Sequence, residues 1–252
     1  MKICYFTATG NSLYVARRIG GELLPIPQLM KKDEIVIEDD AVGIVCPVYC
    51  GEMPKMVREF MKKARIKTDY FFFINTYGMQ DTVAKQNAAS VSQKVGLRLD
   101  YCESVVMVDN FLPGFEMKDQ IDHSGEKKIE EQIDKICNAI NKRETNQVDL
   151  SFKKKAEMAV VHNTMAKMIL TGKSALSYIV NDDCIRCGIC AKVCPANNIT
   201  VSDHVEFSDH CEVCYACLHN CPKNAIHMKS EKSAVRFRND NVSLEDIIAA
   251  NE

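Results

Sequence analysis

Residues 2–19, KICYFTATGNSLYVARRI, carry the pattern that decides the fold. The run KICYFT has the β-branched and aromatic character of a buried strand. After it come TATGNS, residues 7–12, a turn of small and hydroxyl-bearing residues, and then apolar side chains at helical spacing. A strand, a turn and a helix in this order predict the first unit of a parallel α/β sheet.

The same alternation continues to about residue 148. Runs that are nearly continuous in apolar residues, as parallel strands are, occur at 42–49, 70–77 and 103–109, with a weaker one at 23–26. Helical patterns accompany them at 12–22, 54–64, 82–96 and 126–143. This alternation predicts a doubly wound parallel sheet covered by helices on both faces.

The composition is that of an ordinary globular protein. The chain has 252 residues, of which 46% are hydrophobic and 26% charged, and its net charge is −2. No overall basicity points to nucleic acid, and no run of apolar residues is long enough to predict a membrane span. The N-terminus lacks the apolar stretch and cleavage site of a signal peptide, so we expect a cytoplasmic protein.

The chain has 13 cysteines, and eight of them lie between Cys184 and Cys221. They form two copies of C-x2-C-x2-C-x3-C-P, namely CIRCGICAKVCP at 184–195 and CEVCYACLHNCP at 211–222. The second copy follows the first by 27 residues at every cysteine and at the proline, which marks an internal repeat. Because a cytosolic chain keeps its thiols reduced, such a dense group indicates a metal site rather than disulfides.

The spacing within each copy fits iron–sulfur chemistry. Three thiolates two residues apart can wrap one face of a four-iron cluster, whereas the fourth, before proline, reaches the other cluster. Two zinc sites are the alternative, but zinc gains nothing from the third cysteine, the proline or the duplication. The expected ligands are Cys184, Cys187, Cys190 and Cys221 for one [4Fe–4S] cluster and Cys211, Cys214, Cys217 and Cys194 for the other.

This repeat resembles the bacterial two-cluster ferredoxins over residues 178–230, which implies a small α+β domain that holds two clusters. The two copies differ at one position, where the second has Tyr215 and the first has Gly188. The tyrosine either shields its cluster from water, which would tune the reduction potential, or simply packs.

The TATGNS turn has the character of a phosphate-binding loop. It matches neither G-x-x-x-x-G-K-[ST] nor G-x-G-x-x-G, and no lysine or arginine lies between Ile3 and Ala16. The hydroxyls of its threonines and serine, one amide and the N-terminus of the following helix can surround a phosphate. The turn resembles the loop of the flavodoxin family, which cradles the phosphate of FMN with uncharged groups.

In a flavodoxin-like sheet the ligand lies beyond the carboxyl ends of the strands, so the loops after the later strands should meet the flavin. These loops, at 46–54 and 75–79, offer aromatic rings that can stack and glycines that allow close approach. The segment 109–115 either touches the edge of the flavin or only turns the chain, and we favour the turn. The expected FMN-binding residues are Thr7, Thr9, Gly10, Asn11, Ser12, Pro47, Val48, Tyr49, Gly51, Asn75, Thr76, Tyr77 and Gly78.

The five remaining cysteines divide into two kinds. One lies in the expected flavin loop, where it is a candidate to react with the flavin or tune it, and this is Cys50. The others are expected to be inert thiols, and these are Cys4, Cys46, Cys102 and Cys137.

The two resemblances together cover nearly the whole chain, which is similar to flavodoxin–ferredoxin fusion proteins of anaerobic bacteria and archaea. They imply a flavodoxin-like FMN-binding domain at 1–148, a connector helix at 149–176, a two-cluster domain at 177–230 and a C-terminal tail at 231–252.

FMN exchanges one or two electrons and a [4Fe–4S] cluster exchanges one, so their combination favours an electron-transfer protein of anaerobic metabolism. An FMN-dependent reductase of a small molecule, fed by its own clusters, is one alternative, and a redox sensor that acts through the connector is another. The expected partner is a redox protein or a small-molecule acceptor. The oligomeric state is open, with a homodimer as one option.

Overall fold

The computed structural model describes the backbone of all 252 residues and every side chain except that of Met168. Its largest sheet has five strands in the order β2-β1-β4-β6-β7, and every neighbouring pair is parallel. This is the flavodoxin-like doubly wound order, so the predicted fold class is confirmed. The strands are β1 (Lys2–Tyr5), β2 (Glu22–Pro25), β4 (Ala41–Pro47), β6 (Tyr70–Tyr77) and β7 (Tyr101–Val106).

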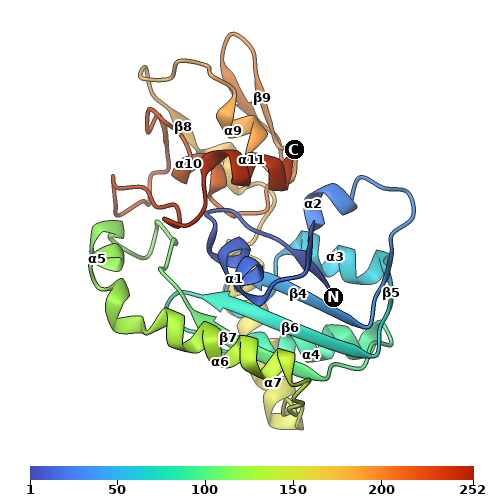
Figure 1. The fold of residues 1–252 in the computed structure, drawn as a ribbon. Helices are drawn as coiled ribbons and strands as arrows, with labels where there is room; N and C mark the ends of the chain where they lie inside the picture. The colour runs from blue at the N-terminus through green and yellow to red at the C-terminus, as the bar shows by residue number, and fades with distance from the viewer.

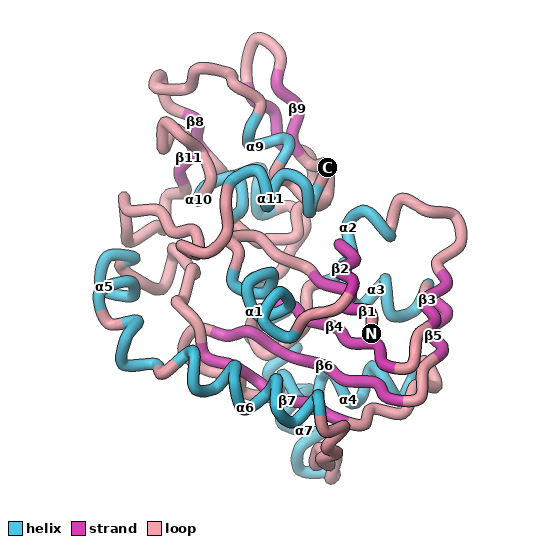
Figure 2. The backbone as a smooth tube through the Cα atoms, viewed as in Figure 1, coloured by secondary structure: helices cyan, strands magenta, loops and turns pink.

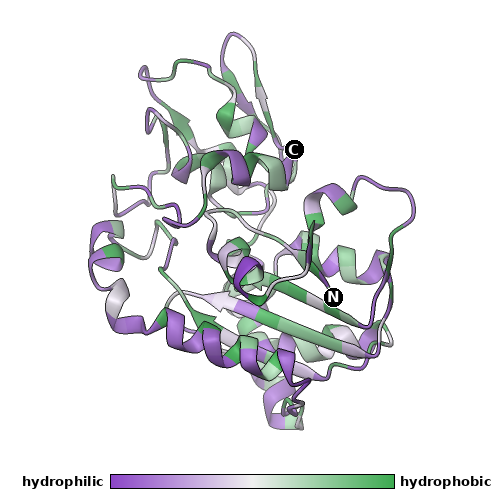
Figure 3. Cartoon of the chain, in the orientation of Figure 1, coloured by the Kyte–Doolittle hydropathy of each residue, from purple (hydrophilic) through white to green (hydrophobic). Residues whose placement is uncertain are grey.

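Helices cover both faces of this sheet (Figure 1). Helices α1 (Asn11–Ile19) and α6 (Ile129–Asn141) pack together on one face, whereas α3 (Lys55–Lys63) and α4 (Ala84–Lys94) pack on the other. Figure 3 shows the strands as mostly hydrophobic and α6 as largely hydrophilic on its outer side. The core between these layers includes the fully buried rings of Phe6, Phe60, Phe71, Phe72 and Phe73.

Several short elements near the sheet were not predicted. Strands β3 (Val36–Glu38) and β5 (Arg65–Lys67) form a separate parallel pair beside the main sheet. Helices α2 (Ile26–Leu29), α5 (Met117–Asp122) and the 3₁₀ helix η1 (Ser124–Lys127) are each too short to show a helical period. Helix α1 ends before the expected residue 22, because Gly20 and Gly21 both adopt positive φ angles.

The cysteine-rich region is small and mostly irregular, with two antiparallel strand pairs (Figure 2). A short helix follows the start of each cysteine motif, α9 in the first copy and α10 in the second. This arrangement is the small α+β region that was predicted. Its elements are the 3₁₀ helix η3 (Ser174–Ser177), β8 (Ile179–Val180), α9 (Ile189–Lys192), β9 (Ile199–Val201), β10 (Val205–Phe207), α10 (Ala216–His219) and β11 (Ile226–His227).

The connector is helical but not uniform. It consists of α7 (Phe152–Val161), a π-helical turn η2 (His162–Ala166) and α8 (Lys167–Ile169). Helix α7 packs against α4 of the sheet region, and the chain then rises to the cysteine-rich region (Figure 1). The π turn lies where the connector passes the carboxyl ends of the strands, and such turns are frequent at functional sites.

The segment after residue 231, expected as a tail, packs between the two regions. Its helix α11 (Leu244–Asn251) contacts α2 of the sheet region and α9 of the cysteine-rich region. Ile247 is fully buried, and the guanidinium of Arg17 forms an ion pair with the carboxylate of Asp246. The C-terminal segment therefore joins the two regions instead of extending from one of them.

Candidate cofactor sites

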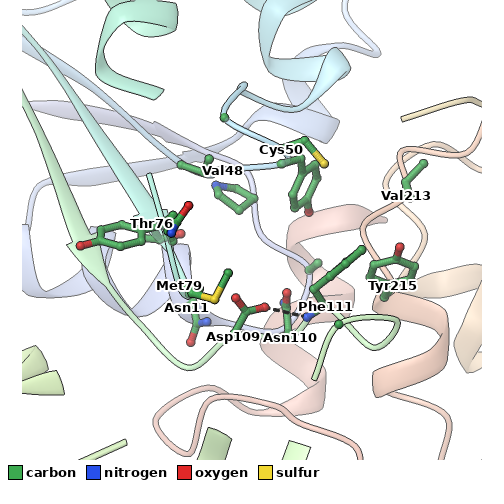
Figure 4. Close-up of a pocket in the computed structure, with 18 of the residues that line it drawn as sticks. Asn11, Val48, Cys50, Thr76, Met79, Asp109, Asn110, Phe111, Val213 and Tyr215 are labelled. Carbon is green, nitrogen blue, oxygen red and sulfur yellow. Dashed lines mark hydrogen bonds between the residues drawn. The ribbon is translucent and has the colours of Figure 1, made fainter. Parts of the chain in front are cut away.

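A cavity of about 450 Å³ lies beyond the carboxyl ends of β1, β4 and β6. Its wall is shared by the sheet region, the connector and the second cysteine motif, as the labelled side chains in Figure 4 show in part. Because such a crevice is where doubly wound sheets bind their ligands, the cavity is the candidate cofactor site. Of the predicted residues, it is lined by Thr7, Thr9, Asn11, Ser12, Pro47, Val48, Tyr49, Gly51, Thr76, Tyr77 and Gly78.

The TATGNS turn forms one end of this cavity. Thr7, Thr9 and Ser12 are each at most 2% exposed, so their hydroxyls face the protein and the cavity rather than bulk water. Gly10 has a φ of 99°, and a Cβ there would lie 2.9 Å from the Cβ of Val242. Among the described side chains none caps the N-terminus of α1, which leaves the N–H groups of its first turn available to an anion.

Hydrogen bonds hold the turn in place. The hydroxyls of Ser12 and Thr76 are 2.8 Å apart, which ties the turn to the end of β6. Asn110 Nδ2 donates to Thr9 Oγ1 at 2.8 Å, and Asn11 Nδ2 donates to the carbonyl of Val108 at 2.9 Å. No lysine, arginine or histidine is among the residues described around the cavity, so an anion there would meet neutral donors.

Two predicted residues do not line the cavity. Gly10 shapes the turn from behind, as its contact with Val242 shows. Asn75 is 1% exposed inside β6, and its amide lies 4.0 Å from the sulfur of Cys102. Because successive side chains of a strand point to opposite faces, Thr76 can reach the cavity only if Asn75 points away from it.

The loop after β7 is part of the cavity wall, although the sequence favoured a turn over contact with the ligand. Asp109, Asn110, Phe111 and Phe115 all line the cavity. Gly78 on the neighbouring loop allows this approach, because a Cβ at that position would collide with the Asp109 carboxylate. The available signal was the place of this loop after the fourth predicted strand, at the same edge of the sheet.

Asp109 is the acidic group of this cavity. Burial raises the pKa of its carboxyl, whereas the N–H of Phe111, 2.9 Å from the carboxylate, and the ammonium of Lys127 act in the opposite direction. Burial also lowers the pKa of Lys127, whose Nζ donates to the carbonyl of Met107 at 2.8 Å. Asp109 can therefore take up a proton more readily than a solvent-exposed carboxylate.

Further cavity residues come from parts of the chain that sequence reasoning did not connect with the flavin loops. Met165, Ile169 and Leu170 belong to the connector and contribute apolar surface. Val213 and Tyr215 belong to the second cysteine motif (Figure 4). No local pattern in the sequence could have shown these contacts, because they join segments that are more than 80 residues from the nearest flavin loop.

Cys50 lines the cavity and has a left-handed backbone, with a φ of 50°. Burial raises the pKa of its thiol, and Glu52 raises it further, so the reactive thiolate form is disfavoured. Burial likewise raises the pKa of Cys4 to about 12 and that of Cys46 well above its ordinary value. Cys102 is also buried and Cys137 partly so, as expected for inert thiols.

The eight repeat cysteines fall into two spatial groups. One cavity is lined by sulfur-bearing side chains from both ends of the repeat, namely those of Cys184, Cys187, Cys190 and Cys221. Burial is the main cause that raises the pKa of Cys214, and Cys211 and Cys194 raise it further. Burial also raises the pKa of Cys217, with further contributions from Cys214, Cys194, Cys211 and Cys190. The first cavity thus brings three cysteines of one motif together with the fourth cysteine of the other.

The two motifs also share their backbone geometry. Arg186 and Val213, which are equivalent in the repeat, have φ angles of 56° and 54°. Gly188 and Tyr215, likewise equivalent, have φ angles of 78° and 59°. A left-handed conformation is uncommon for valine and tyrosine, so the motif imposes it whatever the side chain.

The groups differ in their surroundings. Cys187 is exposed and its neighbour Ile185 is 58% exposed, whereas Cys214 and Cys217 are buried. The carboxylate of Glu212 accepts a hydrogen bond of 3.1 Å from the N–H of Met56 in α3. The first group is therefore near the molecular surface, and the second is enclosed where the two regions meet.

His219, to which the sequence assigned no role, joins the second motif to the cavity loops. Its Nδ1 accepts from the N–H of Phe237 at 3.1 Å, so Nε2 carries the proton and donates to the carbonyl of Asn110 at 2.9 Å. Burial lowers the pKa of His219 to about 4. Next to it, Asn220 Nδ2 donates to the carbonyl of Ala8 in the TATGNS turn at 3.2 Å.

Across the described side chains, no three His, Cys, Asp or Glu residues converge in the manner of a site for a single metal ion. Among the helices described here, none is both long enough and apolar enough to cross a membrane.

Solved structures similar to this chain include a putative flavoprotein from Bacteroides uniformis, with 12% identity and a TM-score of 0.31 over 48% of this chain and 94% of that one. The Trp repressor binding protein from Bacillus subtilis has 9% identity and a TM-score of 0.29 over 42% of this chain and 83% of that one.

The family model of the 4Fe-4S binding domain matches residues 177–200. The pyruvate synthase subunit PorD of Methanothermobacter marburgensis is 34% identical over 55 residues, which are 22% of this chain and 67% of that protein. The cysteine motifs, their paired geometry and these matches agree: through its C-terminal region, the chain belongs to the family of 4Fe-4S binding proteins.

Proposed function

We propose that this protein transfers electrons between two [4Fe–4S] clusters and FMN in anaerobic metabolism in the cytoplasm. The observation that carries the proposal is the shared wall of the flavin cavity. Val213 and Tyr215 line that cavity and also stand between the cysteines of the second motif. A flavin in the cavity and a cluster at the second motif would therefore be neighbours without bulk water between them.

The residues of the cavity fit FMN. The uncapped N-terminus of α1 and the hydroxyls of the TATGNS turn would hold the phosphate, with no positive side chain among the described lining residues. The apolar remainder of the wall would take the ring system, because its aromatic and sulfur-containing side chains suit a large flat group. The wall residues of this kind are Tyr49, Met79, Phe111, Phe115 and Met165.

The two cysteine groups fit two clusters with crossed ligands. Cys184, Cys187 and Cys190 share their cavity with Cys221. Cys194 belongs to the same buried cluster as Cys217, and it contributes to the raised pKa of Cys214. These placements support the ligand sets expected from the spacing, in which each proline-linked cysteine binds the cluster of the other motif.

The chemistry that the bound groups supply is electron exchange, one at a time for each cluster and singly or in pairs for FMN. The chain itself sets the order in which a partner can reach them. The first set of cysteines lies at the surface, so a redox partner would exchange electrons with the cluster bound there. The cluster at the buried second set would relay these electrons to the flavin. The described residues around the cavity would exclude water from the space between the second cluster and the flavin.

A flavin-dependent reductase is the second candidate, and Asp109 is the observation that favours it. A half-buried carboxyl with a raised pKa at the cavity wall could hold a proton for a small-molecule acceptor. A reductase of this kind would lose turnover in the Asp109→Asn variant while it keeps its flavin. An electron carrier would keep its rate of electron exchange with the partner in the same variant.

The test of the proposed function is an anaerobic preparation of the full chain, with iron, sulfide and flavin measured on one sample. We expect the iron of two four-iron clusters and one FMN for each chain. A reductive titration followed by visible absorbance and electron paramagnetic resonance (EPR) should then show two cluster signals and flavin bleaching. Iron for a single cluster, or a preparation that does not bind added FMN, would contradict the proposal.

A further inference from the structure

Two buried tyrosine hydroxyls near the second cysteine motif have no hydrogen-bond partner among the described groups. They belong to Tyr49 and Tyr178, which are far apart in the sequence. A buried hydroxyl without a partner loses its hydrogen bonds to water and gains nothing in return, so native proteins rarely contain one. Each of these hydroxyls is therefore expected to face a group that binds there.

Tyr49 approaches the second motif from the flavin side. Its backbone is fixed by a tight turn, in which its N–H donates to the carbonyl of Glu52 at 2.8 Å and its carbonyl accepts from the same residue at 3.0 Å. Its side chain lines the flavin cavity. Burial raises the pKa of its hydroxyl. Its ring packs against the buried cluster of side chains that contains Cys214.

Tyr178 approaches the same motif from another part of the chain. It is 8% exposed, and its ring packs edge-on against Phe207 with the ring centres 5.6 Å apart. Burial raises the pKa of its hydroxyl, and Cys217 and Cys211 are the next contributors. Its side chain belongs to the same buried cluster as Cys194 and Cys217, and Cys211 packs against that cluster.

The cavity of the first motif offers no such donor. Its described lining consists of four cysteines, apolar residues, a glycine, a proline, Arg186 and Lys223, and it contains no hydroxyl-bearing side chain. The two motifs have the same cysteine spacing and the same backbone conformation, so the tyrosine hydroxyls are a feature that distinguishes the second motif from the first.

We propose, on the basis of the proposed function, that Tyr49 and Tyr178 each donate a hydrogen bond to sulfur of the second cluster. The acceptors would be the thiolates of the cysteines that bind the cluster or the inorganic sulfides of the cluster itself. Hydrogen bonds to cluster sulfur stabilise the additional negative charge of the reduced state and so raise the reduction potential. One electron on the first cluster would then move more favourably to the second, with no bond made or broken.

The experiment compares the full-length protein with Tyr49→Phe, Tyr178→Phe and the double variant, all prepared anaerobically. Tyr70→Phe is the control, because the Tyr70 hydroxyl donates to the carbonyl of Glu144 at 2.7 Å and Tyr70 lies outside the cavity. Potentials are measured by redox titration with EPR detection. A soluble paramagnetic relaxing agent identifies the first cluster, because only that cluster is near the surface.

We expect each single variant to lower the potential of the second cluster and the double variant to lower it further. The potential of the first cluster should stay as in the parent and in Tyr70→Phe, and Tyr178→Phe should also keep the flavin content of the parent. Electron–nuclear double resonance should also lose one exchangeable proton coupling of the second cluster in each variant, which a purely structural role would not cause.

Unchanged potentials and proton couplings in both variants would overturn the proposal. A shift in the flavin potential alone in Tyr49→Phe would also overturn it for that residue, because the hydroxyl would then serve the flavin. Failure of the proposed function itself is recognised separately, because the parent protein would then lack the iron and the EPR signal of a second cluster.

Discussion

The two cysteine motifs have the same sequence pattern and nearly the same backbone, but they occupy different surroundings. In the first, Cys187 and Ile185 are exposed. In the second, Cys214 and Cys217 are buried between the cysteine-rich region and the sheet region. Equivalent ligands can therefore hold clusters with different access to water and to partners.

Equivalent positions outside the ligands show how the difference arises. Lys192 in the first motif is exposed, and its counterpart 27 residues later, His219, is 5% exposed and bonded to a cavity loop. Gly188 has open space around it, whereas Tyr215 packs against Phe111 with the ring centres 6.0 Å apart. The two copies therefore differ at non-ligand positions, and these differences bring the second copy into contact with the cavity loops.

The largest expected effect comes from exchanging one ligand in each group. Cys194→Ala should abolish the second cluster and leave the first, because a buried site cannot replace a lost thiolate with water. Cys221→Ala should do the reverse. Iron content and EPR of the two variants measure this directly. Loss of the first cluster in Cys194→Ala would contradict the crossed ligand sets.

The next prediction separates the flavin site from the cluster beside it. Thr9→Ala combined with Ser12→Ala removes two hydroxyls from the phosphate end of the cavity. Hydrogen bonds to a charged group contribute about 1.5–3 kcal/mol each, so FMN affinity should fall roughly 100-fold or more. The measurement is FMN binding to flavin-free protein by fluorescence quenching.

Both clusters should remain in this double variant, since neither residue contacts a repeat cysteine. Ser90→Ala, on α4 and outside the cavity, is the control and should bind FMN as the parent does. Unchanged FMN affinity in the double variant would show that the TATGNS turn is not the phosphate site.

Much of the fold and the positions of both cysteine motifs could be predicted from local sequence patterns. The strands of the main sheet and the cysteine spacing are encoded in short stretches, each of which carries its own signal, such as KICYFT or the repeated C-x2-C-x2-C. What could not be predicted depends on contacts between distant segments. The placing of Tyr215 in the flavin cavity and the packing of Ile247 between regions follow from the assembled fold, and no period in the sequence marks them.

The same limit explains the errors in detail. Asn75 was assigned to the flavin site along with Thr76, because a sequence run does not show which residue of a strand points toward the ligand. The loop at 109–115 was expected to turn, since Pro113 and Gly114 are typical of turns. The loop does turn, and the turn directs Phe111 and Phe115 into the cavity.

Of the two cysteine motifs, only the second contains a buried histidine, His219, and this residue should make the stability of the protein depend on pH. Burial lowers the pKa of His219 to about 4, whereas an unfolded histidine has a pKa near 6.5. Below pH 6.5 the unfolded chain binds a proton that the folded chain does not, so stability is highest above pH 6.5 and falls until about pH 4. This loss amounts to about 3 kcal/mol at most.

Anaerobic urea unfolding at pH 7.5 and pH 5.5 measures the expected change. His219→Gln, which keeps a donor for the Asn110 carbonyl, should flatten the pH dependence. Lys192→Gln, at the equivalent position of the first motif, should leave it as in the parent. An unaltered pH dependence in His219→Gln would show that another group is responsible.

The smallest expected effect comes from making the second motif like the first at one position. Tyr215→Gly relieves a left-handed backbone at a non-glycine residue, which costs about 1–2 kcal/mol. It also removes a ring that is 6% exposed and separates the flavin cavity from the cysteines. Loss of the buried ring costs about 3–5 kcal/mol and outweighs this relief, so the variant should be less stable than the parent.

The rate at which an iron chelator removes the second cluster measures how well Tyr215 separates the cavity from the cysteines. Flavin-free Tyr215→Gly should lose its second cluster to an iron chelator several-fold faster than the parent, whereas the first cluster should be lost at the parental rate. Tyr215→Phe keeps the ring and should behave as the parent does. Equal rates in Tyr215→Gly and Tyr215→Phe would mean that the tyrosine only packs. A selective acceleration in Tyr215→Gly would show instead that one side chain makes the buried motif different in access from its exposed copy.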